Sequence, residues 1–129
     1  MSKLIKKNDA TFVDLGTKFI TKYTSEDKSL EINHMKIHGR HPENPEHFVY
    51  EEQVHFMLYV VSGTGTVWCD SECYEVSVGD VVDVPAKTKF AVDSTDETFE
   101  YFALQSPAWS PEQAFIVNKE GTVVEQTTK

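Results

Sequence analysis

The sequence predicts an all-β fold of antiparallel strands, a barrel or a sandwich, and three observations support this prediction. The run from Val54 to Val61 is almost entirely apolar and rich in β-branched and aromatic side chains, which is typical of a strand buried on both faces. Gly63 and Gly65 follow, and glycines in a strand pattern mark a bend where one sheet passes to another. The run Val81 to Val84 stops at Pro85, because proline has no N–H for a central ladder.

A hairpin is predicted between the glycines and the proline. Its polar connection, Asp70 to Glu72, separates two short strand patterns. Cys69 and Cys73 stand on either side of this turn, and only cross-strand neighbours meet the geometry of a disulfide. In a chain without a secretion signal, two cysteines are more often free thiols than a disulfide.

The other elements are read from alternation and from turn residues. Residues 1–16 predict an edge strand or a short arm, and the sequence leaves both options open. Residues 39–47 contain two prolines and no periodicity, so they predict a loop. Further strands are predicted over Phe19 to Tyr23, Leu30 to Ile37, Phe90 to Val92 and Thr98 to Leu104.

The composition is that of one ordinary globular domain. The chain has 129 residues, of which 40% are hydrophobic, enough for one core and too few for two domains. The net charge of −9 argues against non-specific binding to nucleic acid or to anionic membranes. The amino-terminal segment has no apolar signal-peptide core and no run approaches a membrane span, so we expect a cytoplasmic protein.

Two motifs carry a resemblance to a known family. "YVVSGTGTV" (residues 59–67) and "GDVVDVP" (residues 79–85) resemble the cupin superfamily over roughly residues 30–117. "GRHPE" (residues 39–43) and "SPAWSPEQ" (residues 106–113) are similar to short single-domain cupins of unassigned function. The resemblance implies a double-stranded β-helix, or jelly-roll, barrel that pairs as a homodimer.

The same resemblance divides the single domain into three segments. Residues 1–29 are expected to form an arm and the first strands, and residues 30–117 the barrel. Residues 118–129 are expected to form a polar tail that frays.

Many cupins hold a metal ion inside the barrel, and the resemblance allows their ligand positions to be tested here. The family's two paired histidines fall at Tyr50 and Glu52, its glutamate at Phe56 and its last histidine at Phe90. None of these positions keeps the family's ligand, and phenyl rings donate nothing to a metal. We therefore expect no metal of the usual cupin kind and no cofactor.

A non-standard metal site stays open as an alternative, because imidazole is a common ligand. Its spacing matches no helical zinc pair, and histidines in loops are usually solvated. The candidates are Glu52 and four histidines, namely His38, His41, His47 and His55.

Alternation along the strand suggests what fills the pocket instead. Tyr50, Glu52 and Phe56 are expected on the inward face, which leaves one carboxyl group among aromatic rings with Phe90. Desolvation would raise the pKa of this carboxyl group, so that it acts as an acid or a base near neutrality. The alternative is that Glu52 faces solvent, because a buried unpaired carboxylate is costly.

These residues lead to a hypothesis of small-molecule binding. We expect a sugar or a small carboxylic metabolite between the rings of Phe56 and Phe90, with Trp109 over one end. Arg40 would bind an anionic group or form a surface salt bridge. The catalytic form of this hypothesis is an isomerase or epimerase in which Glu52 transfers a proton with Tyr50 or a histidine as its partner. A metal-dependent enzyme and a non-catalytic protein-interaction cupin are the alternatives.

Overall fold

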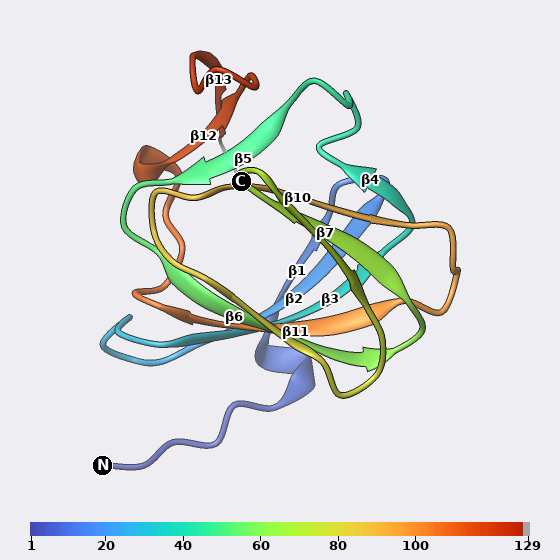
Figure 1. Cartoon of the computed structure of the whole chain (residues 1–129). Coiled ribbons are helices and arrows are strands. Elements are labelled where there is room, and N and C mark those ends of the chain that lie inside the picture. The colour runs from blue at the N-terminus through green and yellow to red at the C-terminus, as the bar shows by residue number, and fades with distance from the viewer. Residues whose placement is uncertain (128–129) are drawn as a thin grey trace.

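The structure is a computed structural model that describes residues 1–127, and two antiparallel sheets facing each other form most of it (Figure 1). The first sheet contains, in spatial order, β1 (Thr11–Asp14), β2 (Lys18–Thr24), β3 (Glu31–Ile37), β11 (Glu100–Ser106), β6 (His55–Ser62) and β9 (Val81–Val84). The second contains β13 (Val123–Gln126), β12 (Ala114–Val117), β5 (Phe48–Glu51), β10 (Lys89–Ser94), β7 (Gly65–Cys69) and β8 (Glu72–Val76), with β4 (Gly39–His41) also paired to β10. Two 3₁₀ turns, η1 (Lys7–Asp9) and η2 (Pro111–Gln113), lie outside the sheets. The prediction of an all-β fold is confirmed.

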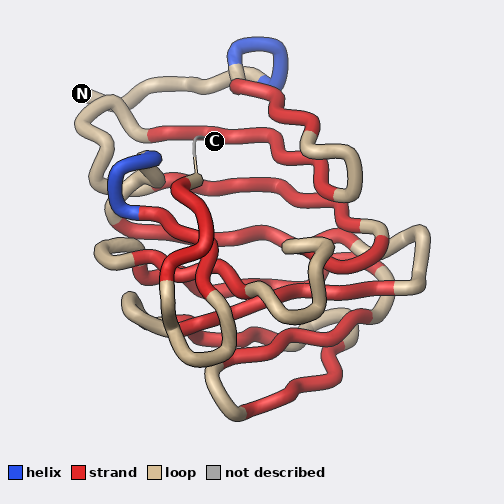
Figure 2. The backbone as a smooth tube through the Cα atoms, turned by 90° about the horizontal axis from the view of Figure 1, so that it is seen from above, coloured by secondary structure: helices blue, strands red, loops and turns tan. Residues whose placement is uncertain are grey.

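From β5 onward the chain moves repeatedly from one sheet to the other. Strands β5, β7, β8, β10 and β12 belong to the second sheet, whereas β6, β9 and β11 belong to the first. Seen from above, the strands are joined by short loops (Figure 2). The apolar side chains between the sheets form the core.

The glycine bend lies between β6 and β7, where the chain leaves one sheet for the other, as the sequence predicts. Gly63 has a φ of 73°, and a Cβ there would lie 2.9 Å from the backbone of Phe99. A Cβ on Gly65 would lie 2.6 Å from the Phe99 ring. Both positions need glycine because the neighbouring strand connection packs directly against them.

Strand β6 differs from its prediction. Phe56, Leu58 and Val60 are buried, but Met57 and Tyr59 alternate with them and are 44% and 42% exposed. The expectation of burial on both faces is wrong, because no layer of the described chain covers the outer side of this sheet. The run is apolar throughout because the outward positions of β6 are also occupied by apolar side chains, those of Met57 and Tyr59.

Both ends of the chain join sheets. Of the two options for residues 1–16, the structure has the edge strand, β1, paired with β2. β13 pairs with β12 inside the expected tail, of which residues 128–129 lie outside the described part. No helix among the described residues is long and apolar enough to cross a membrane.

Two local expectations change. The expected loop over residues 39–47 begins with the short strand β4. The cysteines are both free, and the register explains why they are not cross-strand neighbours: Cys69 lies opposite Glu72, and Cys73 lies opposite Trp68.

Candidate functional site

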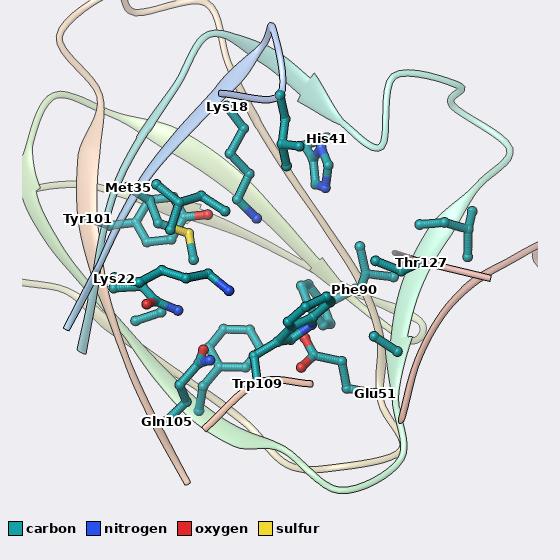
Figure 3. Close-up of a pocket in the computed structure, with 18 of the residues that line it drawn as sticks. Lys18, Lys22, Met35, His41, Glu51, Phe90, Tyr101, Gln105, Trp109 and Thr127 are labelled. Atoms are coloured by element: carbon teal, nitrogen blue, oxygen red, sulfur yellow. The ribbon is translucent and has the colours of Figure 1, made fainter. Parts of the chain in front are cut away.

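A cavity of about 240 Å³ lies between the two sheets, and its wall is partly apolar and partly charged. The polar wall comes from β2, β3 and β11 of the first sheet, from β4 and β5, and from the end of the described chain at β13 and Thr127. Figure 3 shows these side chains projecting into the cavity from different sides. The polar side chains used below are Lys18, Lys22, Asn33, His41, Glu51 and Gln105.

Lys18 and Glu51 are the two most deeply buried charged groups of this wall. Lys18 lies on β2 and is 9% exposed, whereas Glu51 ends β5 in the opposite sheet and is 7% exposed. Burial lowers the pKa of Lys18 to about 8, although the charge of Glu51 opposes this shift. Burial raises the pKa of Glu51 to about 7, against the hydrogen bond from Gln113 and the charges of Lys18 and Lys22.

Lys18 and Glu51 affect each other's pKa through their charges, although their side chains form no ion pair. Among the described residues, no ion pair joins Glu51 to Lys18 or to Lys22. Both side chains project into the cavity, with Phe90 and Trp109 beside Glu51 (Figure 3).

Gln113 fixes the position of Glu51. Its Oε1 accepts hydrogen bonds from the backbone N–H groups of Gln53 and Val54, at 3.1 and 3.3 Å, which holds the bend between β5 and β6. Its Nε2 donates to Oε1 of Glu51 at 3.4 Å. One buried amide thus shapes the bend and orients the carboxyl group beside it.

His41 is the histidine that reaches this cavity, from β4. Burial lowers its pKa to about 3, and the positive charges of Lys18 and Arg40 lower it further. The imidazole is therefore neutral near pH 7, so it offers one hydrogen-bond donor and one acceptor rather than a charge.

Three of the aromatic residues expected from the sequence lie in the wall. The rings of Phe56 and Phe90 meet edge to face, with centroids 4.9 Å apart. Trp109 lines the cavity too, and Nζ of Lys22 lies 4.4 Å from the centroid of its ring.

The structure corrects the position expected for the carboxyl group. Glu52 is exposed and Tyr50 is not part of the wall, whereas their neighbour Glu51 points inward. Alternation holds within a strand, but β5 ends at Glu51 and the bend that follows carries an odd number of steps to Phe56. A prediction that continues the alternation of β5 through the bend therefore places Glu52 inside, whereas the structure has Glu51 there.

Arg40 also lies away from the cavity. Its guanidinium donates to the carbonyl oxygens of Pro42 and Asn44, at 2.7 and 2.5 Å. The same group lies over the rings of Phe48 and Trp68, with centroid distances of 5.1 and 5.5 Å. It braces the loop between β4 and β5, which is a structural role that the sequence does not distinguish from anion binding.

The residues present do not fit a cupin metal. The Phe56 and Phe90 rings pack together at two of the family's ligand positions, and Tyr50 and Glu52 lie outside the cavity. The alternative histidines are dispersed: His38 is exposed, His47 lies 3.4 Å from the amide of Asn44, and His55 pairs with Asp83 at 2.5 Å. Within residues 1–127, no three His, Cys, Asp or Glu side chains converge as metal ligands.

The sequence analysis missed Lys18, Lys22 and Glu51. Shifting the register of the family motif by one residue places Val49 and Glu51 at the histidine positions, which does not restore a metal site and therefore did not single out Glu51. The two lysines share a face of β2 with Ile20, and by composition this face looks like the solvent side. One sequence signal could have indicated a polar cavity: β2 and β3 have polar residues on both of their faces.

Solved structures of the same shape were found, although no protein-family model and no curated protein matches the sequence. A Streptomyces Pac13 variant with uridine has a TM-score of 0.77 and 18% identity, covering 92% of each chain, and Pac13 is described as a nucleoside dehydratase. KdgF from Halomonas sp. has a TM-score of 0.68 and 16% identity, covering 85% of this chain and 97% of its own. A cupin-2 domain protein from Rhodospirillum rubrum has a TM-score of 0.63 and 11% identity, covering 85% of this chain and 78% of its own.

These likenesses agree with the topology, in which strands pass back and forth between two facing antiparallel sheets. The expectation from the glycine and proline motifs is confirmed at the level of fold. The chain therefore has the cupin fold, a double-stranded β-helix barrel of the jelly-roll type.

Proposed function

We propose that this chain binds a small hydroxylated metabolite, of the sugar or nucleoside class, inside the barrel and catalyses proton transfer from and to that metabolite. The observation that carries the proposal is that Lys18 and Glu51 are both buried in the wall of one cavity, on opposite sheets, and that no described ion pair joins them. Their pKa values, about 8 and about 7, lie close to neutrality. An acid and a base are most effective when their pKa values lie near the working pH.

The wall of the cavity supports the substrate class. Trp109 and the two phenyl rings offer apolar surface for the face of a sugar ring or a base. Asn33 and Gln105 offer polar groups for hydroxyls on the opposite side. Pac13 and its variants with uridine share this fold, which makes a nucleoside a reasonable member of the class to test first.

The proposed chemistry needs two proton positions. The Glu51 carboxylate takes a proton from a C–H bond beside a carbonyl group, and the Lys18 ammonium stabilises the oxygen on which negative charge develops. Returning the proton to a different carbon or face gives isomerisation or epimerisation. Expelling a neighbouring hydroxyl instead breaks a C–O bond, forms a C=C bond, and releases water that carries the Lys18 proton.

The experiment detects proton transfer without knowing the product. The protein is incubated in D₂O with a panel of sugars, keto sugars and nucleoside aldehydes, and NMR and mass spectrometry follow deuterium uptake and the loss of water. We expect the wild-type protein to react with at least one compound and Glu51→Gln to bind it without reacting.

Glu52→Gln is the matched control, because Glu52 is the adjacent carboxyl group and is exposed. It should react as fast as wild type. Equal loss in both variants would contradict the assignment of Glu51. Binding without exchange in wild type would leave a non-catalytic binding protein, and no binding at all would favour a role in protein interaction.

A further inference from the structure

Among the described residues of the cavity wall, two buried side-chain atoms have no hydrogen-bond partner, Oγ1 of Thr127 and Oδ1 of Asn33, and the second belongs to strand β3. Asn33 lines the cavity and is 2% exposed, and its Oδ1 is buried without a hydrogen bond. Nearly all buried polar atoms in proteins are paired, and an unpaired one is costly. A buried acceptor without a partner in the wall of a cavity points to a bound molecule that supplies a donor.

The orientation of this amide is fixed from behind by Glu31. Nδ2 of Asn33 donates to Oε1 of Glu31 at 3.1 Å, and Nε2 of Gln105 donates to the same oxygen at 2.8 Å. The hydroxyl of Thr24 donates to the other carboxyl oxygen at 2.7 Å. Turning either amide around would place a carbonyl oxygen against a carboxyl oxygen, so both amides keep their N–H groups on Glu31.

The strand register explains why two amides share one carboxyl group. Glu31 and Asn33 lie on β3, with side chains on the same face, and Gln105 of β11 lies directly opposite Glu31. All three are buried. Each of the two amide nitrogens uses one of its N–H groups on Glu31, whereas Oδ1 of Asn33 is an acceptor without a partner.

We infer that Asn33 determines specificity by accepting a hydrogen bond from a hydroxyl or N–H group of the bound molecule, and that Glu31 is a positioning residue for this contact. The inference rests on the proposed function and narrows its substrate class. The molecule presents a donor to the wall formed by β3 and β11. A carboxylate or phosphate oxygen is disfavoured against Oδ1 of Asn33, because it would bring one acceptor against another.

Two probe series test this by removing one donor at a time. They are uridine with its 2′-deoxy, 3′-deoxy and N3-methyl derivatives, and D-glucose with its 2-, 3- and 4-deoxy derivatives. Affinity is measured by calorimetry or NMR titration. In wild type, loss of one particular donor should weaken binding roughly 5- to 100-fold. In Asn33→Leu, the same change should alter affinity less than about 2-fold, because the acceptor is gone.

The role of Glu31 has its own variants. Glu31→Gln keeps a carbonyl oxygen to which both amides can donate, so it should keep the preference of wild type. Glu31→Met removes that oxygen and should lose the preference. Thr24→Val is the control, because it removes a donor from the other side of Glu31 and leaves the amides in place. If Asn33→Leu does not fold, which a thermal melt reveals, Asn33→Ser replaces it.

The outcomes separate the inference from the proposal beneath it. If neither uridine nor glucose binds, the proposed function fails for this class and the inference fails with it. If a parent compound binds but no single donor matters, or if Asn33→Leu keeps the full preference of wild type, the inference alone is overturned.

Discussion

At the scale of single residues, burial shifts the pKa values of Lys18 and Glu51 in opposite directions. Burial favours the neutral form of each group, so the pKa of Lys18 falls to about 8 and that of Glu51 rises to about 7. Between these values most lysine side chains are protonated and most glutamate side chains are ionised. This narrow interval is where one group can donate a proton while the other accepts one.

The first prediction concerns the pH dependence of the reaction. We expect a bell-shaped profile of kcat/KM that rises near pH 7, as Glu51 loses its proton, and falls near pH 8, as Lys18 loses its own. The two values belong to the coupled pair. Steady-state rates from pH 5 to pH 10 test this, and Lys18→Arg should remove the fall near pH 8. A flat profile would contradict the assigned roles.

The second prediction concerns stability. The folded-state pKa of Glu51 is raised from 4.5 to about 7, so the stability that its protonated form contributes is present below pH 4.5 and is lost as the pH rises to 7. Glutamine has no proton to lose. Glu51→Gln should therefore match wild type near pH 4 and exceed it at pH 8, by at most about 3 kcal/mol.

Urea unfolding at the two pH values measures this difference. Glu52→Gln, at the exposed neighbour, should unfold like wild type at both. A loss of stability in Glu51→Gln at pH 8 would show that the carboxylate contributes more by attraction to the lysines than it costs by burial.

At the scale of elements, the outer face of the first sheet is apolar where four strands meet. Leu104 of β11 lies opposite Ile32 of β3 and Met57 of β6, and Tyr59 of β6 lies opposite Val81 of β9. These side chains are each between 42% and 46% exposed. Contiguous exposed apolar surface marks an interaction site, and a second copy of the chain would cover it symmetrically.

We predict a homodimer through this face. Leu104→Lys should give a monomer that still folds, because the substituted side chain is largely exposed. Sedimentation velocity over a range of concentrations measures the change. Tyr74→Lys is the matched control on β8 of the other sheet, where the tyrosine is 42% exposed, and it should stay dimeric. A wild-type protein that is monomeric at every concentration would contradict this prediction.

Two glycines allow the cost of a positive φ to be separated from the cost of a steric clash. One is Gly63, in the bend between β6 and β7, and the other is Gly79. Gly63 and Gly79 both have positive φ, of 73° and 91°, but only at Gly63 would a Cβ meet the backbone of Phe99. We expect Gly79→Ala to cost about 1–2 kcal/mol of unfolding free energy through its backbone conformation, and Gly63→Ala to cost more. Denaturant unfolding compares the two. Equal costs would mean that Phe99 moves aside freely.

At the scale of the whole molecule, aromatic and polar side chains line the cavity between the two sheets, at the place where many cupins have a metal centre. Phe56 of the first sheet and Phe90 of the second meet where the family resemblance places ligands, so contact between rings joins the sheets there. The polar groups of the cavity include one neutral histidine and one buried carboxyl group, that of Glu51, on whose pKa the charges of two lysines act. This set favours proton transfer over metal binding.

We therefore predict that exhaustive dialysis against a chelator changes neither the melting temperature nor deuterium exchange with a reactive compound. The physical reason is that phenyl rings provide no lone pair for an ion. Calorimetry and the exchange assay, before and after dialysis and after adding Zn²⁺, Fe²⁺ or Ni²⁺, provide the measurement. A melting temperature that falls on dialysis and recovers with one metal would contradict it.

The all-β class and the position of the bend followed from local chemistry. Glycine at Gly63 and proline at Pro85 constrain the backbone wherever they occur, so they identify strand boundaries without knowledge of the fold. The shared face of Phe56, Leu58 and Val60 is equally local, because alternation within β6 sets it, but the run is apolar on both faces and does not show which face turns inward.

The charged wall did not follow from local chemistry. On β2, the face with Lys18 and Lys22 turns inward, and on β3, Asn33 turns inward while Ile32 is 46% exposed. Hydrophobicity predicts the opposite orientation for such faces, because it assumes that the inside of the barrel is apolar throughout.

By itself, the sequence determined that the chain forms antiparallel strands and where some of them end, and its resemblance to cupins placed aromatic rings at two of the positions where many cupins have metal ligands. Only the tertiary structure decided which carboxyl group faces Lys18 and which amide oxygen is left without a partner. The reason is that the side-chain period of two applies within one strand, whereas a bend between sheets can change it by one residue. The pairing of distant strands then determines which polar groups share the cavity.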